Sequence, residues 1–157
     1  MMNQRRTFMR QSGGLTVLGL ALAAGLIKPG GAMAAEAWNK ALFDTKNVAD
    51  TEKLLGAGTP IESKDITLTA PDIAENGAVV PISVSSTIPK VEQIAILVEK
   101  NPTTLAAAFG IPDGTDPMVT TRVKLGQSTD VYALVKADGR LYFAKKEVKV
   151  TLGGCGG

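Results

Sequence analysis

The amino-acid sequence predicts an all-β fold: a β-sandwich of about seven strands, with a short N-terminal helical segment and a flexible C-terminal arm. Short segments in which apolar and polar residues alternate recur at intervals of roughly 8–14 residues, as in half-buried strands. Turn-forming residues separate these segments, and Asp138-Gly139 between two apolar-rich stretches is a strong hairpin signal. The chain has 157 residues, of which 45% are hydrophobic, so it can form one modest core.

A helical segment is expected ahead of the sandwich, over residues 35–60. Ala37, Ala41 and Leu42 recur there at helical spacing. Asp50 is expected to cap a short helical turn that Gly56 ends. Residues 61–152 are assigned to the sandwich.

The first half of the sandwich contains three predicted strands. Residues 66–69 and 80–85 alternate between apolar and polar side chains, and Asn76-Gly77 marks a turn between them. Pro81 predicts that the second strand lies at an edge or carries a bulge, because proline lacks the backbone N–H of a central strand. Residues 91–98 are nearly all apolar, which favours a strand that is buried on both faces or central in a sandwich.

The second half begins with an irregular segment, residues 101–117, in which prolines interrupt regular structure. Within it, residues 105–109 fit a helical turn or a strand equally well. Residues 118–125 alternate, and Met118 is expected in the core. Residues 131–136 and 141–144 form the predicted hairpin, and apolar residues alternate again over 148–152.

Residues 1–34 have the three parts of a secretory signal. Arg5-Arg6 lies in a basic start, a 15-residue apolar run follows over 13–27, and Ala32-Met33-Ala34 is a small-residue cleavage site. A membrane anchor is the alternative, but the run is shorter than the ~20 residues that cross a bilayer. The paired arginines are typical of twin-arginine (Tat) signals. The sequence therefore predicts export to the periplasm, with no membrane association once the signal is removed.

Removal of the leader reverses the sign of the net charge. The whole chain has 17 basic and 15 acidic residues, and the leader holds four of the cations and none of the acids. The mature chain thus has 13 basic and 15 acidic residues, a formal charge of −2. Because nonspecific phosphate binding needs a basic surface, we expect no nucleic-acid partner.

The residue inventory excludes most enzymatic chemistry. The chain has no histidine, which removes Ser-His-Asp and Cys-His catalysis and every histidine-containing metal site. It has one cysteine, which removes intrachain disulfides and cysteine-only metal clusters. We therefore expect no catalytic residue, metal or cofactor in this chain, and no enzyme activity.

The single cysteine lies near the C-terminus between two pairs of glycines. The arm consists of residues 153–157: Gly153, Gly154, Cys155, Gly156 and Gly157. Glycine imposes no Cβ restraint, so this arm is expected to be thin and flexible, and no core can form around the thiol. A thiol of ordinary pKa, about 8.5, is mostly protonated at neutral pH, and no activating base is evident in the sequence. Cys155 is therefore interpreted as a handle for a covalently held group, with the chemistry done by another protein.

The chain resembles the SoxY family, the sulfur-carrier subunits of the periplasmic thiosulfate-oxidising (Sox) multienzyme system. The resemblance is carried by the twin-arginine leader, the ITLTAP strand (66–71), the IAENGAVVP run (73–81) and the terminal VKVTLGGCGG. It implies an immunoglobulin-like sandwich that forms a heterodimer with a second β-sandwich subunit, SoxZ. It also implies that Cys155 is the covalent attachment site for sulfur and that the four glycines form a swinging arm.

The resemblance further implies three enzymes that act on the carried group. A c-type cytochrome joins thiosulfate oxidatively to the cysteine. A metal-dependent hydrolase removes the terminal sulfone as sulfate, and a sulfane dehydrogenase, where present, oxidises the remaining sulfur.

Two other functions of the tail stay open on the sequence. The exposed thiol could link two copies of an exported β-sandwich interaction module through a disulfide. The terminal Gly156-Gly157 could instead carry sulfur as a thiocarboxylate, although that chemistry needs ATP and so conflicts with an export leader. Lys145, Lys146 and Lys149 either steer an anionic substrate or form the solvated face of a strand.

Overall fold

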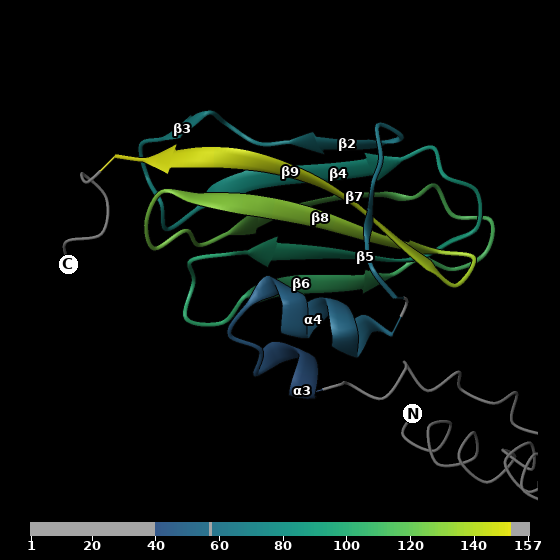
Figure 1. Ribbon diagram of the computed structural model, residues 1–157. Helices are drawn as coiled ribbons and strands as arrows, with labels where there is room; N and C mark the ends of the chain where they lie inside the picture. Colours follow the sequence, from purple (N-terminus) through teal and green to yellow (C-terminus); the bar gives the residue numbers. More distant parts are fainter. Residues whose placement is uncertain (1–39, 57, 152–157) are drawn as a thin grey trace, which may run out of the picture. The chain divides into compact units, whose positions relative to one another are not determined.

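The computed structural model describes residues 40–56 and 58–151, so the predicted leader, Leu152 and the arm lie outside the described residues. In the described part, two helices precede nine strands (Figure 1). The helices are α3 (Lys40–Phe43) and α4 (Val48–Leu55). The strands are β1 (Ile61–Glu62), β2 (Ile66–Thr69), β3 (Ile73–Ala74), β4 (Val80–Ser86), β5 (Val91–Val98), β6 (Leu105–Gly110), β7 (Met118–Val123), β8 (Thr129–Ala137) and β9 (Arg140–Val150).

The strands form the predicted all-β sandwich of two sheets. One sheet has the order β1-β9-β8-β5-β6, with β3 also paired to β9, and the other has the order β2-β4-β7. The chain passes between the sheets from β4 to β5, from β6 to β7 and from β7 to β8, as in immunoglobulin-like folds. The described part has nine strands and not the expected seven or so. Strands β1, β3 and β6 were not among the predicted strands, and two predicted segments are joined in β9.

The main core lies between the two sheets. Alternate residues of the strands point into it, which is the reason for the period-2 pattern in the sequence. Ile82 and Val84 of β4 face Ile94 and Ile96 of β5, and Val131 of β8 joins them. All five are completely buried or nearly so.

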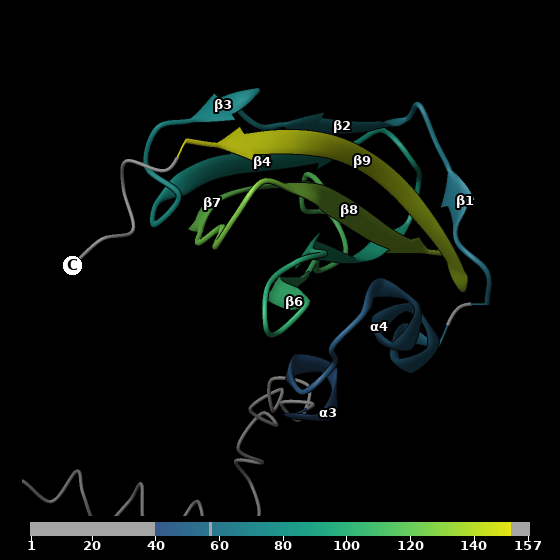
Figure 2. The same ribbon diagram turned by 60° about the vertical axis from the view of Figure 1, so that its left-hand side comes forward.

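A second core covers the opposite face of the larger sheet. Leu42 of α3 and Leu55 of α4 pack there with Leu97 of β5, Leu134 of β8 and Leu141 of β9. Figure 2 shows both helices on one side of this sheet, away from β2 and β4. The helical segment is therefore a third layer of the domain.

Strand β5 confirms the prediction of a central, doubly buried strand. It lies between β8 and β6, and the last five of its eight residues are buried. Ile94 and Ile96 face the main core, while Ala95 and Leu97 face the helices. The apolar run follows from having a core on each face.

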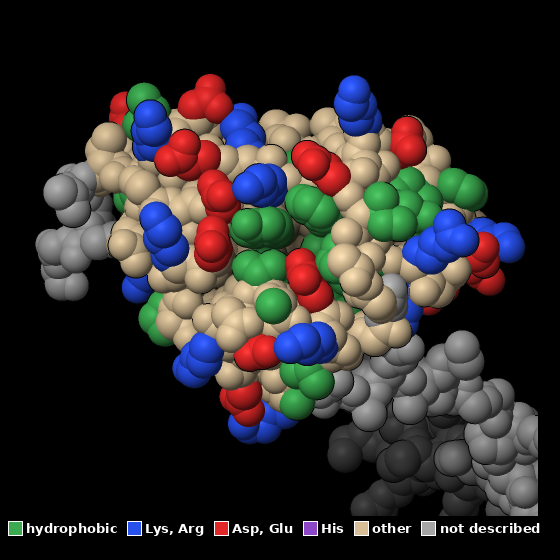
Figure 3. Space-filling view, in the orientation of Figure 1, with side chains coloured by type: hydrophobic (Ala, Val, Ile, Leu, Met, Phe, Trp, Pro, Cys, Tyr) green, Lys and Arg blue, Asp and Glu red, His purple; other side chains and the backbone are tan. Residues whose placement is uncertain are grey.

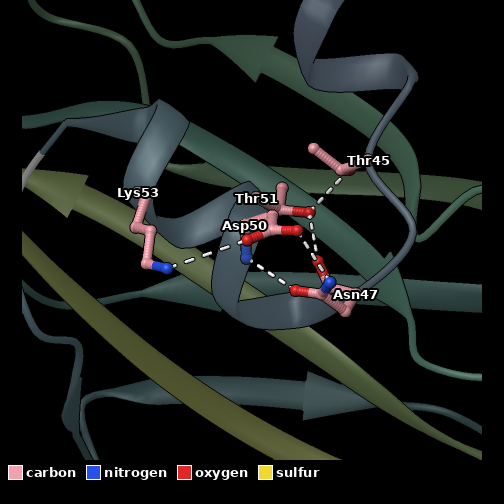
Figure 4. A network of polar contacts seen from close by, with 5 residues as sticks. All are labelled: Thr45, Asn47, Asp50, Thr51 and Lys53. Atoms are coloured by element: carbon pink, nitrogen blue, oxygen red, sulfur yellow. Dashed lines mark hydrogen bonds and ion pairs between the residues drawn. The ribbon is translucent and has the colours of Figure 1, made fainter.

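The cap of helix α4 differs from the prediction. Asn47, not Asp50, is the N-cap: its Oδ1 accepts a hydrogen bond of 2.8 Å from the Asp50 backbone N–H (Figure 4). Asp50 lies in the first turn, where its carboxylate accepts from Asn47 Nδ2 at 2.7 Å. Gly56 ends the helix, as predicted, and it does so in the left-handed conformation at φ 74°.

A buried threonine pair links the two helices beside this cap. Thr51 Oγ1 donates to Thr45 Oγ1 at 2.7 Å, and both side chains are buried (Figure 4). Because Thr45 lies between the two helices, the bond joins this connecting loop to α4.

The predicted hairpin is present, with its turn at Asp138-Gly139. Ala137 pairs with Arg140, so the loop has two residues, and both have positive φ, 49° and 71°. This is the geometry of the mirror-image turns whose twist matches that of the flanking strands. Residues 141–144 and 148–150 belong to one 11-residue strand, β9, which ends at Val150.

Strand pairing and side-chain exposure decide three other expectations. Residues 105–109 form strand β6, because they pair with β5. The prediction from Pro81 that β4 is an edge strand is wrong, because β4 lies between β2 and β7. Pro81 itself pairs only with β7, since β2 ends opposite Ser83. The core placement of Met118 is also wrong: its side chain is 64% exposed on the outer face of β7.

Candidate functional site

Cys155, Gly153, Gly154, Gly156 and Gly157 lie outside the described residues. The structure describes the point from which they leave the sandwich, which is the end of β9 at Val150 and Thr151. We call these two residues the arm root. Figure 1 shows the end of β9 beside β3, at the opposite end of the sandwich from the β8–β9 hairpin.

Strand β3 holds one side of the arm root. Its two residues pair in parallel with Lys149 and Val150. The Lys149 N–H donates to the Asp72 carbonyl at 2.9 Å, and the Thr151 N–H donates to the Ala74 carbonyl at 3.1 Å. The backbone is therefore anchored through Thr151, four residues before Cys155.

Ser128 holds the other side. Strand β8 pairs with β9 only as far as Thr129 opposite Val148, so the next residues of β9 have no β8 partner. Ser128 Oγ accepts a hydrogen bond of 2.9 Å from the Val150 N–H and lies 3.5 Å from the Val150 carbonyl oxygen. A side-chain hydroxyl thus replaces the missing backbone partner.

The turn predicted at Asn76-Gly77 packs directly against the arm root. A Cβ on Gly77 would lie 2.5 Å from the Leu125 carbonyl oxygen and 2.8 Å from Val150 Cγ1. The Gly77 carbonyl accepts a hydrogen bond of 2.7 Å from the Leu125 N–H. Gly77 is required for this close approach and not for a positive φ.

The neighbouring loops are tied to one another at the same end of the sandwich. Asn101 Nδ2 donates to the Lys124 carbonyl at 2.7 Å, and its Oδ1 accepts from the Gly126 N–H at 3.2 Å. The Lys100 N–H donates to Thr129 Oγ1 at 3.1 Å. The arm therefore starts from a cross-linked platform.

Two of the three lysines before the arm, Lys145 and Lys146, have local partners. Lys145 Nζ lies 3.7 Å from an Asp130 carboxylate oxygen and 5.9 Å from the centroid of the Tyr132 ring. Lys146 Nζ lies 2.9 Å from Asp72 Oδ1 and donates to the Ala70 carbonyl at 2.6 Å. These contacts favour a structural role for Lys145 and Lys146. The face in Figure 3 accordingly shows cations and anions side by side.

Burial shifts the pKa values of two side chains, Tyr132 and Glu52. Burial raises the pKa of the Tyr132 hydroxyl above 10.0, and the Glu99 carboxylate raises it further while Lys145 lowers it. Burial also raises the pKa of Glu52 above 4.5. Tyr132 therefore stays protonated and neutral at physiological pH.

The described residues contain neither a cluster of metal ligands nor a membrane-spanning helix. In residues 40–56 and 58–151, no group of three acidic, cysteine or histidine side chains is placed to hold a metal ion. Neither helix of that part has the length and apolar character needed to cross a membrane.

Sequence reasoning missed the residues that anchor the arm. Asp72, Ala74 and Ser128 act through backbone pairing or a single hydroxyl, and neither leaves a periodic pattern. Gly77 was assigned only to a turn. Its contact with Val150 depends on residues far apart in the sequence, so the Asn-Gly pair alone could not reveal it.

Comparison with known proteins identifies relatives. A family described as "Sulfur oxidation protein SoxY" matches residues 51–155, a span that ends at Cys155. Among solved structures, the sulfur carrier protein SoxY from Chlorobium limicola f thiosulfatophilum is 37% identical with a TM-score of 0.59; the match covers 66% of this chain and 96% of that one. No curated protein sequence matches the chain.

A second solved structure shares the fold alone. It is the superoxide reductase (neelaredoxin) from Ignicoccus hospitalis, which is 20% identical with a TM-score of 0.50. The match covers 55% of this chain and 80% of that one. One sandwich fold can carry unrelated functions, so this likeness implies no shared chemistry.

Proposed function

The chain belongs to the SoxY family of sulfur oxidation proteins, and from this membership we propose that Cys155 covalently holds the sulfur intermediates of thiosulfate oxidation. The family places the protein in the Sox system as a sulfur carrier. A carrier holds a group while other proteins transform it. The proposal assigns attachment to Cys155 and mobility to Gly153, Gly154, Gly156 and Gly157.

One observation carries the proposal: the family match runs to Cys155, four residues beyond the last anchored residue of β9. Four residues span at most about 14 Å when extended. A thiol on such an arm can enter a partner's active site, while the anchored platform stays outside.

The chemistry on Cys155 follows from oxidation states. The thiol and thiosulfate form Cys–S–S–SO₃⁻ and release a proton and two electrons, which a c-type cytochrome accepts. A hydrolase then adds water to the terminal sulfone, releasing sulfate and two protons and leaving Cys–S–S⁻. Where a sulfane dehydrogenase is present, it oxidises the remaining outer sulfur.

We further propose that residues 1–34 direct export to the periplasm and that a SoxZ-like β-sandwich subunit binds this chain as a heterodimer. Strand β6 supports a partner of this kind, because it lies at a sheet edge and its sequence, LAAAFG, has no charge. Uncharged edges are commonly covered in native proteins. A stable exported monomer with no bound subunit would contradict the heterodimer.

Intact mass spectrometry of the protein purified from thiosulfate-grown cells tests the proposed function. We expect a chain cleaved after residue 34, with sulfur or sulfonate adducts that fragment analysis places on Cys155. Cys155→Ser should abolish the adducts and leave the unfolding free energy within about 0.5 kcal/mol of wild type, because the substitution lies outside the core.

Three results would oppose this function. A thiol that stays unmodified during turnover contradicts the carrier role. A disulfide-linked homodimer as the main species on non-reducing gels supports the interaction module instead. An adduct on the terminal carboxyl of Gly157 supports the thiocarboxylate.

A further inference from the structure

The short arm limits how far a partner enzyme can stand from this protein. Thr151 is anchored to β3, and the four residues from Thr151 to Cys155 span at most about 14 Å. Enzyme active sites are concave, and their reacting groups lie below the protein surface. An enzyme that receives the arm in a recessed site must therefore bring its entrance against the surface around Thr151. This step rests on the proposed function.

Two exposed apolar side chains lie on that surface. Ile73 is 58% exposed and Val79 is 52% exposed. Ile73 pairs with Lys149, two residues before Thr151, and Val79 follows the Asn76-Gly77 turn that packs against Val150. The described residues include three other large exposed apolar side chains, Leu54, Ile61 and Met118, which belong to α4, β1 and β7.

The backbone holds both side chains in place before any partner binds. Hydrogen bonds on either side of Ile73 join Asp72 and Ala74 to β9. The Val79 N–H donates to the Asn76 carbonyl at 3.4 Å, and the Asn76 side chain accepts from the Ala78 N–H at 2.9 Å. A fixed apolar contact loses little conformational entropy on binding, which favours its use in docking.

We propose that Ile73 and Val79 form a docking patch for the hydrolase that removes sulfate from the group held by Cys155. The occupant is an enzyme whose channel entrance carries an apolar rim. The patch contacts that rim while the arm enters the channel. The apolar contact of the patch stabilises the complex with the enzyme, and the arm carries the sulfur group that reacts.

Strand β1 offers a matched control for this patch. Ile61 is 50% exposed and, like Ile73, lies in a two-residue strand that pairs in parallel with β9. Its partner is Tyr142, seven residues before Lys149, which is roughly 24 Å along the strand. Figure 2 shows β1 and β3 near opposite ends of β9. Ile61 thus lies farther from the arm root than the about 14 Å that the extended arm can span.

The test compares Ile73→Glu, Val79→Glu and Ile61→Glu in the full mature protein with its partner subunit. Tetrathionate loads each variant: the Cys155 thiolate takes up the S–SO₃⁻ group to give Cys–S–S–SO₃⁻, and thiosulfate leaves. Sulfate release by the hydrolase of the same Sox system then gives kcat/KM. Reaction of free Cys155 with a small disulfide reagent measures thiol access without docking.

We expect Ile73→Glu and Val79→Glu each to lower kcat/KM about tenfold, mainly through KM, since each removes a contact made at binding. Ile61→Glu should stay within about twofold of wild type, and all variants should react equally with the small reagent. Ile73→Thr keeps the β-branched shape of a strand residue and should show a smaller loss in the same direction, so an unfolded Ile73→Glu would not end the test.

Two results would overturn the patch. In one, the hydrolase releases sulfate from the Ile73 and Val79 variants with the wild-type kcat/KM. In the other, Ile61→Glu loses as much activity as they do. Failure of the proposed function is distinguishable from both, because the loaded wild-type protein would then release no sulfate.

Discussion

Gly77 shows how a single residue sets the position of the arm root. Its missing side chain lets the 76–78 turn approach both Leu125 and Val150, with no room for a Cβ on either side. The same glycine accepts a backbone hydrogen bond from Leu125. One position therefore joins three segments at the end of the sandwich from which Cys155 departs.

We expect Gly77→Ala to destabilise the protein by about 1–3 kcal/mol, because its Cβ would overlap a backbone carbonyl that cannot move freely. Urea unfolding measures this loss. Gly110→Ala is the control, since a Cβ at Gly110 meets nothing within 4 Å. Equal losses for the two variants would show that the contact at Gly77 has no special role.

Helix α4 is amphipathic, and the partial burial of one of its charged residues changes that residue's pKa. Leu55 faces the second core, while the neighbouring Leu54 is 46% exposed. Glu52, in the middle of the helix, is partly buried, and this burial raises the pKa of its carboxyl above 4.5. The folded protein thus holds the Glu52 proton more tightly than the unfolded chain does.

This shift predicts a pH-dependent effect of Glu52→Gln. A raised pKa gives stability that is present below pH 4.5 and is lost as the pH rises through the higher pKa of the folded state. Glutamine is neutral at every pH, so the variant should be modestly more stable than wild type at pH 7 and equal to it near pH 4. Urea unfolding at both values tests this.

Glu62 is exposed, so Glu62→Gln is the control that removes one carboxylate from the surface without any change in a buried group. A Glu52→Gln protein that is less stable than wild type at pH 7 would mean that the carboxylate makes a favourable contact in the folded state.

The whole molecule has two cores that share one sheet. The sheet that contains β5, β8 and β9 packs against β2-β4-β7 on one face and against α3 and α4 on the other. Loss of either layer exposes apolar residues of the shared sheet to water. The helices and both sheets are therefore expected to unfold together.

Adjacent leucines of α4 test this coupling. Leu55→Ala should cost about 2–5 kcal/mol, because Leu55 is 5% exposed and packs in the second core. Leu54→Ala should change stability by no more than about 0.5 kcal/mol. Urea unfolding followed by far-ultraviolet and near-ultraviolet circular dichroism should give one coincident transition in each variant. Two separate transitions would show that the helical layer unfolds independently.

Several features of this protein were determined by the sequence alone, because they depend on neighbouring residues. Asp138-Gly139 forms a two-residue turn through its own φ preferences, and the alternation in β2 and β4 reflects one buried and one open face. The helix stop at Gly56 is equally local. The GGCGG end is also a local pattern, and the role it predicts for Cys155 stays a prediction.

Other features were decided only by the tertiary structure, because they depend on what a segment packs against. Residues 105–109 suit a helix or a strand, and pairing with β5 selects the strand. Asp50 yields the cap position to Asn47. Met118 is a different case, because it alternates out of phase with Val119 and Val123 and that phase already places it on the outer face. The anchoring of the arm root by β3, Gly77 and Ser128 joins residues 22 to 77 positions apart, and contacts at such separations leave no local pattern in a sequence.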